Sequence, residues 1–108
     1  MCQPGVMLVQ VAMFPLDKAG TSVSADVAEV IDIIDRSGLP YKLTPMATVI
    51  EGEWDEVMEV INRARLKLAE QHSRIYMTMA IDDRKDARGR LTGKIASVEQ
   101  RLGREVDK

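Results

Sequence analysis

Residues 40–57, PYKLTPMATVIEGEWDEV, predict two short strands followed at once by the start of a helix. The extended pieces cover residues 41–45 and 47–51, and they almost run into each other. A connection this short joins antiparallel neighbours, because parallel strands need a crossover of a dozen or more residues. Gly52 is expected to relieve the bend between the second strand and the helix. Acids suit the positive end of a helix dipole, and the first turn carries Glu53, Asp55 and Glu56.

A strand and a helix are also predicted on each side of this stretch. Residues 6–14 form a strand rich in Val and Met, and residues 73–82 form a fourth strand. Apolar residues at helical spacing follow Thr21 and Ser22, either of which can cap the helix, and Gly38 ends it. The expected core side chains are Met7, Val9, Val11, Met13, Val23, Val27, Val30, Ile31, Ile34, Trp54, Val57, Met58, Ile61, Ala64, Leu68, Ile75, Met77, Met79 and Ile81.

The order of these elements predicts an α+β fold, a ferredoxin-like βαββαβ sandwich with an additional C-terminal helix. Both βα crossovers are right-handed, so both long helices lie on the same face of the sheet. Thr92 is a candidate cap for the C-terminal helix. We expect residues 1–108 to form a single domain, with its core over about residues 6–102.

Two layers leave the other face of the sheet without helices. The side chains expected there are small and half apolar, unlike those of a solvated face, which predicts that something covers them. A second copy of the sheet is the simplest cover, and the C-terminal helix could contribute. These side chains are Leu8, Gln10, Ala12, Phe14, Tyr76, Thr78 and Ala80.

Composition excludes several classes of function. The formal net charge is −2 and the pI is about 5.4, which argues against a general binder of nucleic acid or of anionic membranes. Cys2 is the only cysteine, which excludes an internal disulfide, a Cys-rich zinc site and an iron–sulfur cluster. Residues 6–14 are too short to span a membrane and lack a basic leader. We therefore expect a cytoplasmic protein.

Three phrases together resemble the small thiamine-binding protein family: KAGTSVSADVAEVI (18–31), SGLPYKLTPMATVIEGEWDEV (37–57) and IDDRKD (81–86). The resemblance covers about residues 6–102. It implies a ferredoxin-like fold, a homodimer formed by sheet packing and often doubled to a tetramer, and a pocket for the aminopyrimidine half of thiamine. The family offers no catalytic residues to carry over. This chain departs from it at Ala47, where glycine is usual, and at Arg65 and Leu66, where His-Glu is common.

Four side chains are candidates for binding such a ligand, because a planar aminopyrimidine needs hydroxyls and backbone groups and a thiazolium cation favours a carboxylate. Thr21 and Ser22 offer hydroxyls, although capping alone explains them equally well. Thr48 could serve strand propensity alone, and Glu51 could be a solvated strand end. We expect Glu51 to lie near the first βα connection, so that these groups converge.

The sequence predicts no catalytic residues, no metal ligands and no cofactor beyond thiamine as a ligand. His72 is the only histidine and is expected to be solvated at a helix end. The cluster Asp82, Asp83 and Arg84 is expected to be a surface ion-pair group or a subunit contact. Two hypotheses remain. One is a non-catalytic carrier, buffer or sensor of thiamine or its hydroxymethylpyrimidine half, and the other is an oligomerisation module with no dedicated ligand.

Overall fold

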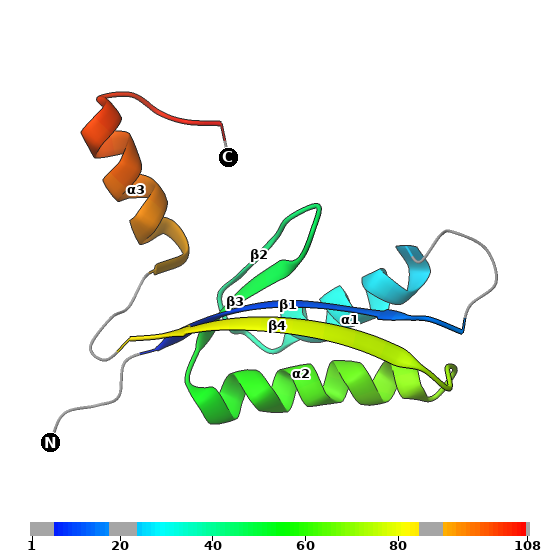
Figure 1. The fold of residues 1–108 in the computed structure, drawn as a ribbon. Coiled ribbons are helices and arrows are strands. Elements are labelled where there is room, and N and C mark those ends of the chain that lie inside the picture. The colour runs from blue at the N-terminus through cyan, green and yellow to red at the C-terminus, as the bar shows by residue number, and fades with distance from the viewer. Residues whose placement is uncertain (1–5, 18–23, 85–89, 108) are drawn as a thin grey trace, which may run out of the picture.

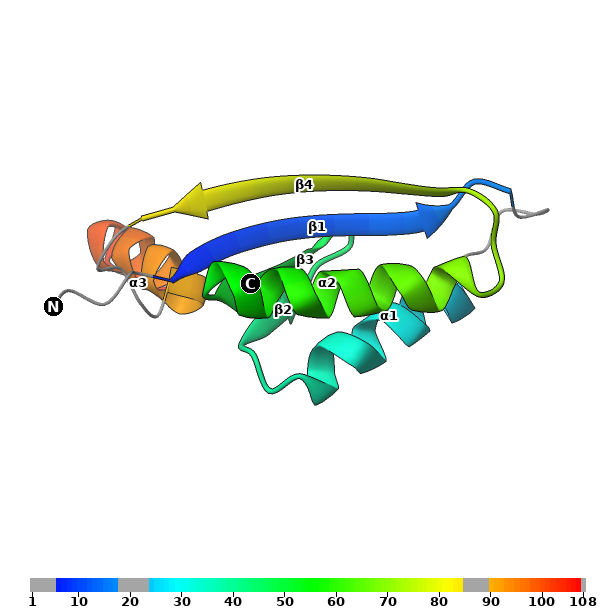
Figure 2. The same cartoon turned by 90° about the horizontal axis from the view of Figure 1, so that it is seen from below.

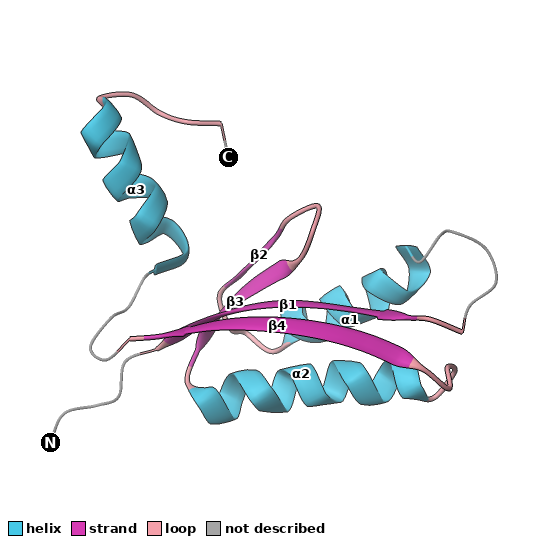
Figure 3. Cartoon of the chain, in the orientation of Figure 1, coloured by secondary structure: helices cyan, strands magenta, loops and turns pink. Residues whose placement is uncertain are grey.

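The computed structural model describes residues 6–17, 24–84 and 90–107. Strands and helices follow the order βαββαβα, and the four strands form one antiparallel sheet in the order β2-β3-β1-β4 (Figure 1, Figure 3). The predicted ferredoxin-like fold with a C-terminal helix is thereby confirmed. The elements are β1 (Met7–Pro15), α1 (Ser24–Arg36), β2 (Tyr41–Leu43), β3 (Thr48–Gly52), α2 (Trp54–Ala69), β4 (Ile75–Asp83) and α3 (Arg90–Leu102).

The core lies between one face of the sheet and the helices α1 and α2, which lie side by side on that face (Figure 1, Figure 2). Alternate residues of β1 point into it, as the period of a strand requires. Most of the predicted core is confirmed, and the side chains that are at most 7% exposed include Met7, Val9, Val11, Met13, Val30, Ile34, Val57, Ile61, Ala64 and Leu68. Trp54 was expected in this core, but it is 54% exposed because it stands at the first position of α2.

The two strands that flank β1 differ in length. β4 pairs with all of β1, from Met7 opposite Asp83 to Pro15 opposite Ile75. β3 pairs only with the first part of β1, and its last pair is Val11 with Thr48. Beyond that pair, no strand among the described residues pairs with β1 on the β3 side.

The hairpin that joins β2 and β3 is tighter than the predicted strand ends suggested. The backbone N–H of Thr44 donates to the Ala47 carbonyl over 2.9 Å, which closes a four-residue turn. The Thr44 hydroxyl also donates to that carbonyl over 2.7 Å and accepts from the Ala47 N–H over 3.1 Å. Pro45 supplies the fixed φ that the second position of such a turn favours. β2 therefore ends at Leu43 rather than at residue 45.

The helix ends confirm one prediction and correct another. Gly38 follows α1 with φ +80°, the left-handed conformation predicted for it. α3 begins at Arg90, so Thr92 lies inside the helix and is not its cap. α3 contacts β3 and stands away from α1 and α2 (Figure 1). Val98 and Leu102 of α3 are each 49% exposed.

Candidate functional site

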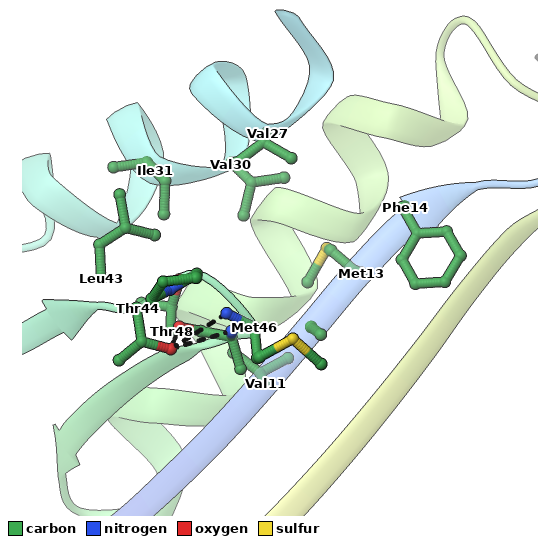
Figure 4. A pocket seen from close by; sticks show the side chains of 13 residues that line it. Val11, Met13, Phe14, Val27, Val30, Ile31, Leu43, Thr44, Met46 and Thr48 are labelled. Carbon is green, nitrogen blue, oxygen red and sulfur yellow. Dashed lines mark hydrogen bonds between the residues drawn. The ribbon is translucent and has the colours of Figure 1, made fainter. Parts of the chain in front are cut away.

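A cavity of about 220 Å³ opens between α1 and the β2–β3 turn, with β1 at its floor (Figure 4). That volume corresponds to about seven waters at roughly 30 Å³ each. Drug-sized ligands occupy pockets of about 300–1,000 Å³, so this cavity suits a single ring. Its described lining has no charged side chain and consists of Val11, Ala12, Met13, Phe14, Val27, Val30, Ile31, Leu43, Thr44, Pro45, Met46, Ala47 and Thr48.

Thr48 supplies a buried hydroxyl to this cavity. The residue is 5% exposed and lies opposite Val11, so its side chain points to the helix side of the sheet (Figure 4). No hydrogen bond joins the Thr48 hydroxyl to another described side chain or backbone group. A hydroxyl held among apolar groups can donate a hydrogen bond to a ligand atom and accept one from another. The binding free energy gained is largest when the ligand makes both hydrogen bonds.

Backbone groups of β1 form a second polar element of the cavity. Residues 12–14 line it, and β3 does not extend far enough to pair with them. Successive residues of a strand direct their N–H and C=O groups to opposite sides, so at least one of these three residues directs both groups toward the β3 side. An unpaired strand edge beside an apolar wall can form hydrogen bonds with the donors and acceptors along the edge of a planar heterocycle.

The rim of the cavity is apolar and adjustable. Met46, at the tip of the turn, is 86% exposed and its side chain reaches over the cavity (Figure 4). Leu43 is 58% exposed on the neighbouring wall. A methionine has three rotatable side-chain bonds and a polarisable sulfur, so it can close against a ring of variable shape. Phe14 stacks at an angle on Tyr76, with 5.6 Å between the ring centroids.

The structure separates the predicted binding residues. Thr21 and Ser22 lie outside the described residues. Glu51 is 7% exposed and pairs with Leu8, so it belongs to the sheet face opposite the helices, whereas Thr48 faces the helices. The first βα connection lies outside the described residues, so its predicted proximity to Glu51 stays a prediction. Glu51 itself lies beside the start of β1, roughly 20 Å from the end of that strand at 3.4 Å per residue.

A second polar cluster, around His72, lies at the far end of β1 and was missed in the sequence. The His72 side chain is 12% exposed, so the solvated position predicted for it is wrong. Its Nε2 lies 2.8 Å from a carboxylate oxygen of Asp26 and its Nδ1 lies 3.1 Å from one of Asp17. The other oxygen of Asp17 accepts from the backbone N–H and the hydroxyl of Ser73, at 2.6 and 2.9 Å.

The two carboxylates favour the charged form of this imidazole. The hydrogen bond to Asp26 is the main cause that raises the pKa of His72 above its ordinary 6.5, and the nearby charges of Asp26 and Asp17 add to it while burial opposes it. The Ser73 hydrogen bonds lower the pKa of Asp17. Both ring nitrogens are engaged, and the Ser73 hydroxyl bonds the carboxylate instead of the imidazole. The cluster therefore ties the start of α1 to the segment that follows α2 and is not arranged as a nucleophile–base pair.

No signal along the chain could have revealed this cluster. His72 lies 55 residues from Asp17 and 46 from Asp26. The fold brings them together because the end of β1, the start of α1 and the end of α2 lie at the same end of the sheet. Among the described residues, no group of three His, Cys, Asp or Glu side chains is arranged to hold a metal ion.

Comparison with known proteins identifies the family. A model of the thiamine-binding protein family matches residues 9–99. The chain belongs to the thiamine-binding protein family. A relative in Methanothermobacter thermautotrophicus, a UPF0045 protein, is 31% identical over 99 residues, which cover 90% of this chain and all of that one.

Solved structures support the same fold. The hypothetical protein MJ1052 of Methanocaldococcus jannaschii superimposes with a TM-score of 0.79 at 27% identity, over 88% of this chain and 97% of that one. A protein of Thermotoga maritima, proposed to act in thiamine biosynthesis or salvage, has a TM-score of 0.73 at 22% identity, over 86% of this chain and 98% of that one. The second likeness concerns the fold alone.

The two departures from the thiamine-binding protein family lie in different places. Ala47 lines the cavity next to Thr48. Arg65 and Leu66 lie on exposed parts of α2 and do not line the cavity. The Arg65 guanidinium donates to the Asn62 side-chain oxygen at 2.8 and 3.2 Å. Of the two departures, only the one at residue 47 touches the cavity.

The structure also bears on membrane insertion. Within the described ranges, no helix is both long and apolar enough to cross a bilayer.

Proposed function

We propose that this protein binds the aminopyrimidine half of thiamine, free or as part of thiamine, in the cavity between α1 and the β2–β3 turn, and releases it unchanged. The observation that carries the proposal is the cavity itself, which is apolar and uncharged, is sized for one ring, and holds the Thr48 hydroxyl beside an unpaired edge of β1. The family name and the sequence resemblance support this choice of ligand.

The chemistry of the lining discriminates between forms of the ligand. A phosphate ester would need Lys or Arg nearby, and the described lining has neither. A neutral aminopyrimidine matches hydroxyl and backbone groups, with its face against Val27, Val30 and Ile31. The thiazolium half of thiamine would then extend past Met46 into solvent.

A carrier, buffer or sensor is the role that fits such a site. No nucleophile–base pair faces the cavity among the described residues, so we propose a binding protein and not an enzyme. With a single cysteine, Cys2, a reducing compartment is the simplest environment, and we propose that the protein acts in the cytoplasm without a bound cofactor.

The experiment is calorimetric titration of protein freed of ligand by unfolding and refolding. We expect hydroxymethylpyrimidine and thiamine to bind with similar affinity, and thiamine diphosphate to bind no tighter. Thr48→Val keeps the shape of the side chain and removes the hydroxyl, which should cost about 1–3 kcal/mol, or roughly 5- to 150-fold in affinity. Thr78→Val is the matched control, because Thr78 lies on the opposite face of the sheet and does not line the cavity.

Two outcomes would contradict the proposal. Absence of binding by the refolded wild-type protein would reject the ligand. Equal binding by wild type and Thr48→Val would reject the cavity as the site. Glu51→Gln tests the other predicted residue, and since Glu51 lies on the opposite face we expect it to leave pyrimidine affinity unchanged.

We also propose that the open face of the sheet joins two copies of the chain. Leu8, Ala12 and Phe14 are only half-buried there, and Tyr76 is 49% exposed. Ala12→Glu would bury a charge in this contact and should abolish it, as sedimentation would show. If the wild-type chain associates as proposed but binds no pyrimidine, that result would favour the alternative function, an oligomerisation module without a ligand, over the binding protein.

A further inference from the structure

His72 joins two of the elements that enclose the cavity. Its Nδ1 lies 3.1 Å from a carboxylate oxygen of Asp17, two residues beyond the end of β1, and β1 forms the floor of the cavity. Its Nε2 lies 2.8 Å from a carboxylate oxygen of Asp26, in the first turn of α1, and α1 forms one wall. The imidazole is therefore a bridge between the floor and the wall.

Asp26 and part of the cavity wall belong to the same turn of α1. Asp26 is 5% exposed and lies toward His72, at the end of α2. Successive residues of a helix turn by about 100°, which places Val27 and Ile31 on the next flank of α1, where they line the cavity (Figure 4). A movement of this first turn that separates Asp26 from His72 therefore also moves Val27.

Both links of the bridge require a protonated imidazole. An ionised carboxylate can only accept a hydrogen bond, so each ring nitrogen must carry a proton to bond the carboxylate that it faces. A neutral imidazole has a single N–H, and its other nitrogen would direct a lone pair at a carboxylate oxygen. Loss of one proton therefore breaks the bridge at one of its two ends. The hydrogen bond to Asp26 raises the pKa of His72 above 6.5, so the bridge breaks above that pH.

Among the described residues, His72 is the cation of this bridge. Lys67 and Glu70, at the end of α2, pair with each other over 3.4 Å. Arg74, just before β4, is exposed. Glu29, one turn further along α1, has a buried carboxylate oxygen without a hydrogen-bond partner among the described residues, and it adds negative charge to that helix. The charge balance of the bridge therefore follows the protonation of its imidazole.

We propose that His72 is a positioning residue for the cavity, which in its doubly protonated form holds the first turn of α1 against the end of β1 and so makes pyrimidine binding weaken as the pH rises. The inference rests on the proposed function of the cavity and adds a pH dependence to it. A neutral imidazole leaves the carboxylates of Asp17 and Asp26 uncompensated, and their repulsion is strong because Asp26 is buried. The first turn then moves outward, and Val27 makes less contact with the ligand ring.

The first experiment measures affinity against pH. Calorimetric titration of wild-type protein with hydroxymethylpyrimidine, between roughly pH 6 and pH 9, should show a fall of about 5- to 10-fold, at the lower end of typical coupling between two sites. His72→Gln can donate to one carboxylate only, so its affinity should be low at every pH. In Asp26→Asn, the side-chain NH₂ can donate to Nε2 of a neutral imidazole while Nδ1–H donates to Asp17. Its affinity should therefore stay at the wild-type low-pH value throughout.

The two variants separate positioning by protonation from a merely structural contact. A structural contact would lower the affinity of both, whereas we expect the pH dependence to disappear at a low affinity in one and at a high affinity in the other. Asp32→Asn is the matched control, the same change on the same helix at an exposed carboxylate that pairs with Arg36 over 3.1 Å, and it should keep the wild-type pH profile. A wild-type affinity equal to that of His72→Gln at every pH, or an Asp26→Asn affinity that falls like wild type, would overturn the inference and leave the proposed function standing.

The second experiment needs no ligand, so it separates a failure of this inference from a failure of the proposed function. His72 is the only histidine of the chain, and its imidazole signals in an NMR titration are therefore unambiguous. We expect the methyl signals of Val27 and Ile31 to shift with the same midpoint as this imidazole, and those of Val57, at the other end of α2, to stay unchanged. Hydroxymethylpyrimidine should raise the proton affinity of His72 by the same 5- to 10-fold, because coupling is reciprocal. Methyl signals that do not follow the imidazole would overturn the positioning role, whether or not the pyrimidine binds.

Discussion

Replacing Gly52 with alanine tests why a glycine ends β3. The sequence favoured a role in relieving a bend, but Gly52 is not among the described glycines with positive φ, which are Gly38 and Gly103. Space is the constraint instead. A Cβ atom on Gly52 would lie 2.9 Å from Cγ2 of Val57 and 3.4 Å from Cδ2 of Leu39. The first turn of α2 approaches the strand so closely that a methyl group does not fit.

The cost of Gly52→Ala can be worked from these contacts. Val57 is fully buried and β-branched in a helix, so its χ1 angle cannot turn away. The helix must move by roughly 0.5 Å to restore an ordinary contact, and overpacking of this kind costs about 1–3 kcal/mol. The lower entropy of the unfolded chain returns about 0.4–1 kcal/mol. We expect a net loss of about 1–2 kcal/mol, which for a domain of this size lowers Tm by about 4–16 °C.

Urea denaturation followed by circular dichroism measures this loss as a lower midpoint with an unchanged slope. Gly93→Ala is the control, since a Cβ at this position inside α3 meets only open space and should stabilise the protein by about 0.5–1 kcal/mol. A second variant, Val57→Ala, removes the clashing methyl group. It should cost less in the Gly52→Ala background than in the wild type, with a coupling of about 0.5–3 kcal/mol. A Gly52→Ala protein as stable as wild type, or additive effects in this cycle, would refute the reasoning.

Three further changes test other parts of the structure. Because the pKa of His72 is raised in the folded state, its ion pairs stabilise that state fully below pH 6.5, and this contribution is lost as the pH rises through the folded-state pKa. The difference in unfolding free energy between wild type and His72→Gln should therefore shrink as the pH rises from 6.5 through that pKa. Urea titrations at several pH values measure it. Ile34→Ala leaves a cavity at a side chain that is 0% exposed and should cost about 2–5 kcal/mol by thermal unfolding, whereas the partly exposed Ile33→Ala should cost less. Gly38→Ala forces a Cβ into φ +80° and should cost about 1–2 kcal/mol in the same assay, and no loss would show that the helix end had adjusted.

The fold could be predicted from the sequence because its two periodicities are clean. Alternation in residues 7–13 and helical spacing in residues 57–68 leave little choice of element or of buried face. The errors lie at positions where the local sequence pattern carries no information about the neighbouring elements. Trp54 fits the apolar stripe of α2, but its place at the very start of the helix leaves it exposed. Met79 and Ile81 fit the core face of β4, but they are 37% and 41% exposed, so the described helices cover them incompletely.

The candidate site was only partly predictable, for a reason that lies in the strand itself. Thr48 was singled out as a ligand-binding candidate, and it lines the cavity, although its role in binding stays a prediction. Glu51 was grouped with it, although residues three apart in a strand point to opposite faces. The direction of pairing was the other missing fact. Since β3 runs against β1, its last residues lie beside the first residues of β1, far from the end of β1.

The cavity exists because one strand is shorter than its neighbour. β1 has nine residues and β3 has five, and the hairpin turn is set by Thr44 and Pro45 rather than by the end of β1. A longer β3 would pair with the backbone groups of residues 12–14 that point away from β4, and it would fill the space above Met13. The same length difference leaves the polar groups of β1 available in a region that α1 keeps apolar. The cavity therefore arises where regular pairing stops, and the binding that we propose for it depends less on any one side chain than on where the β2–β3 turn closes.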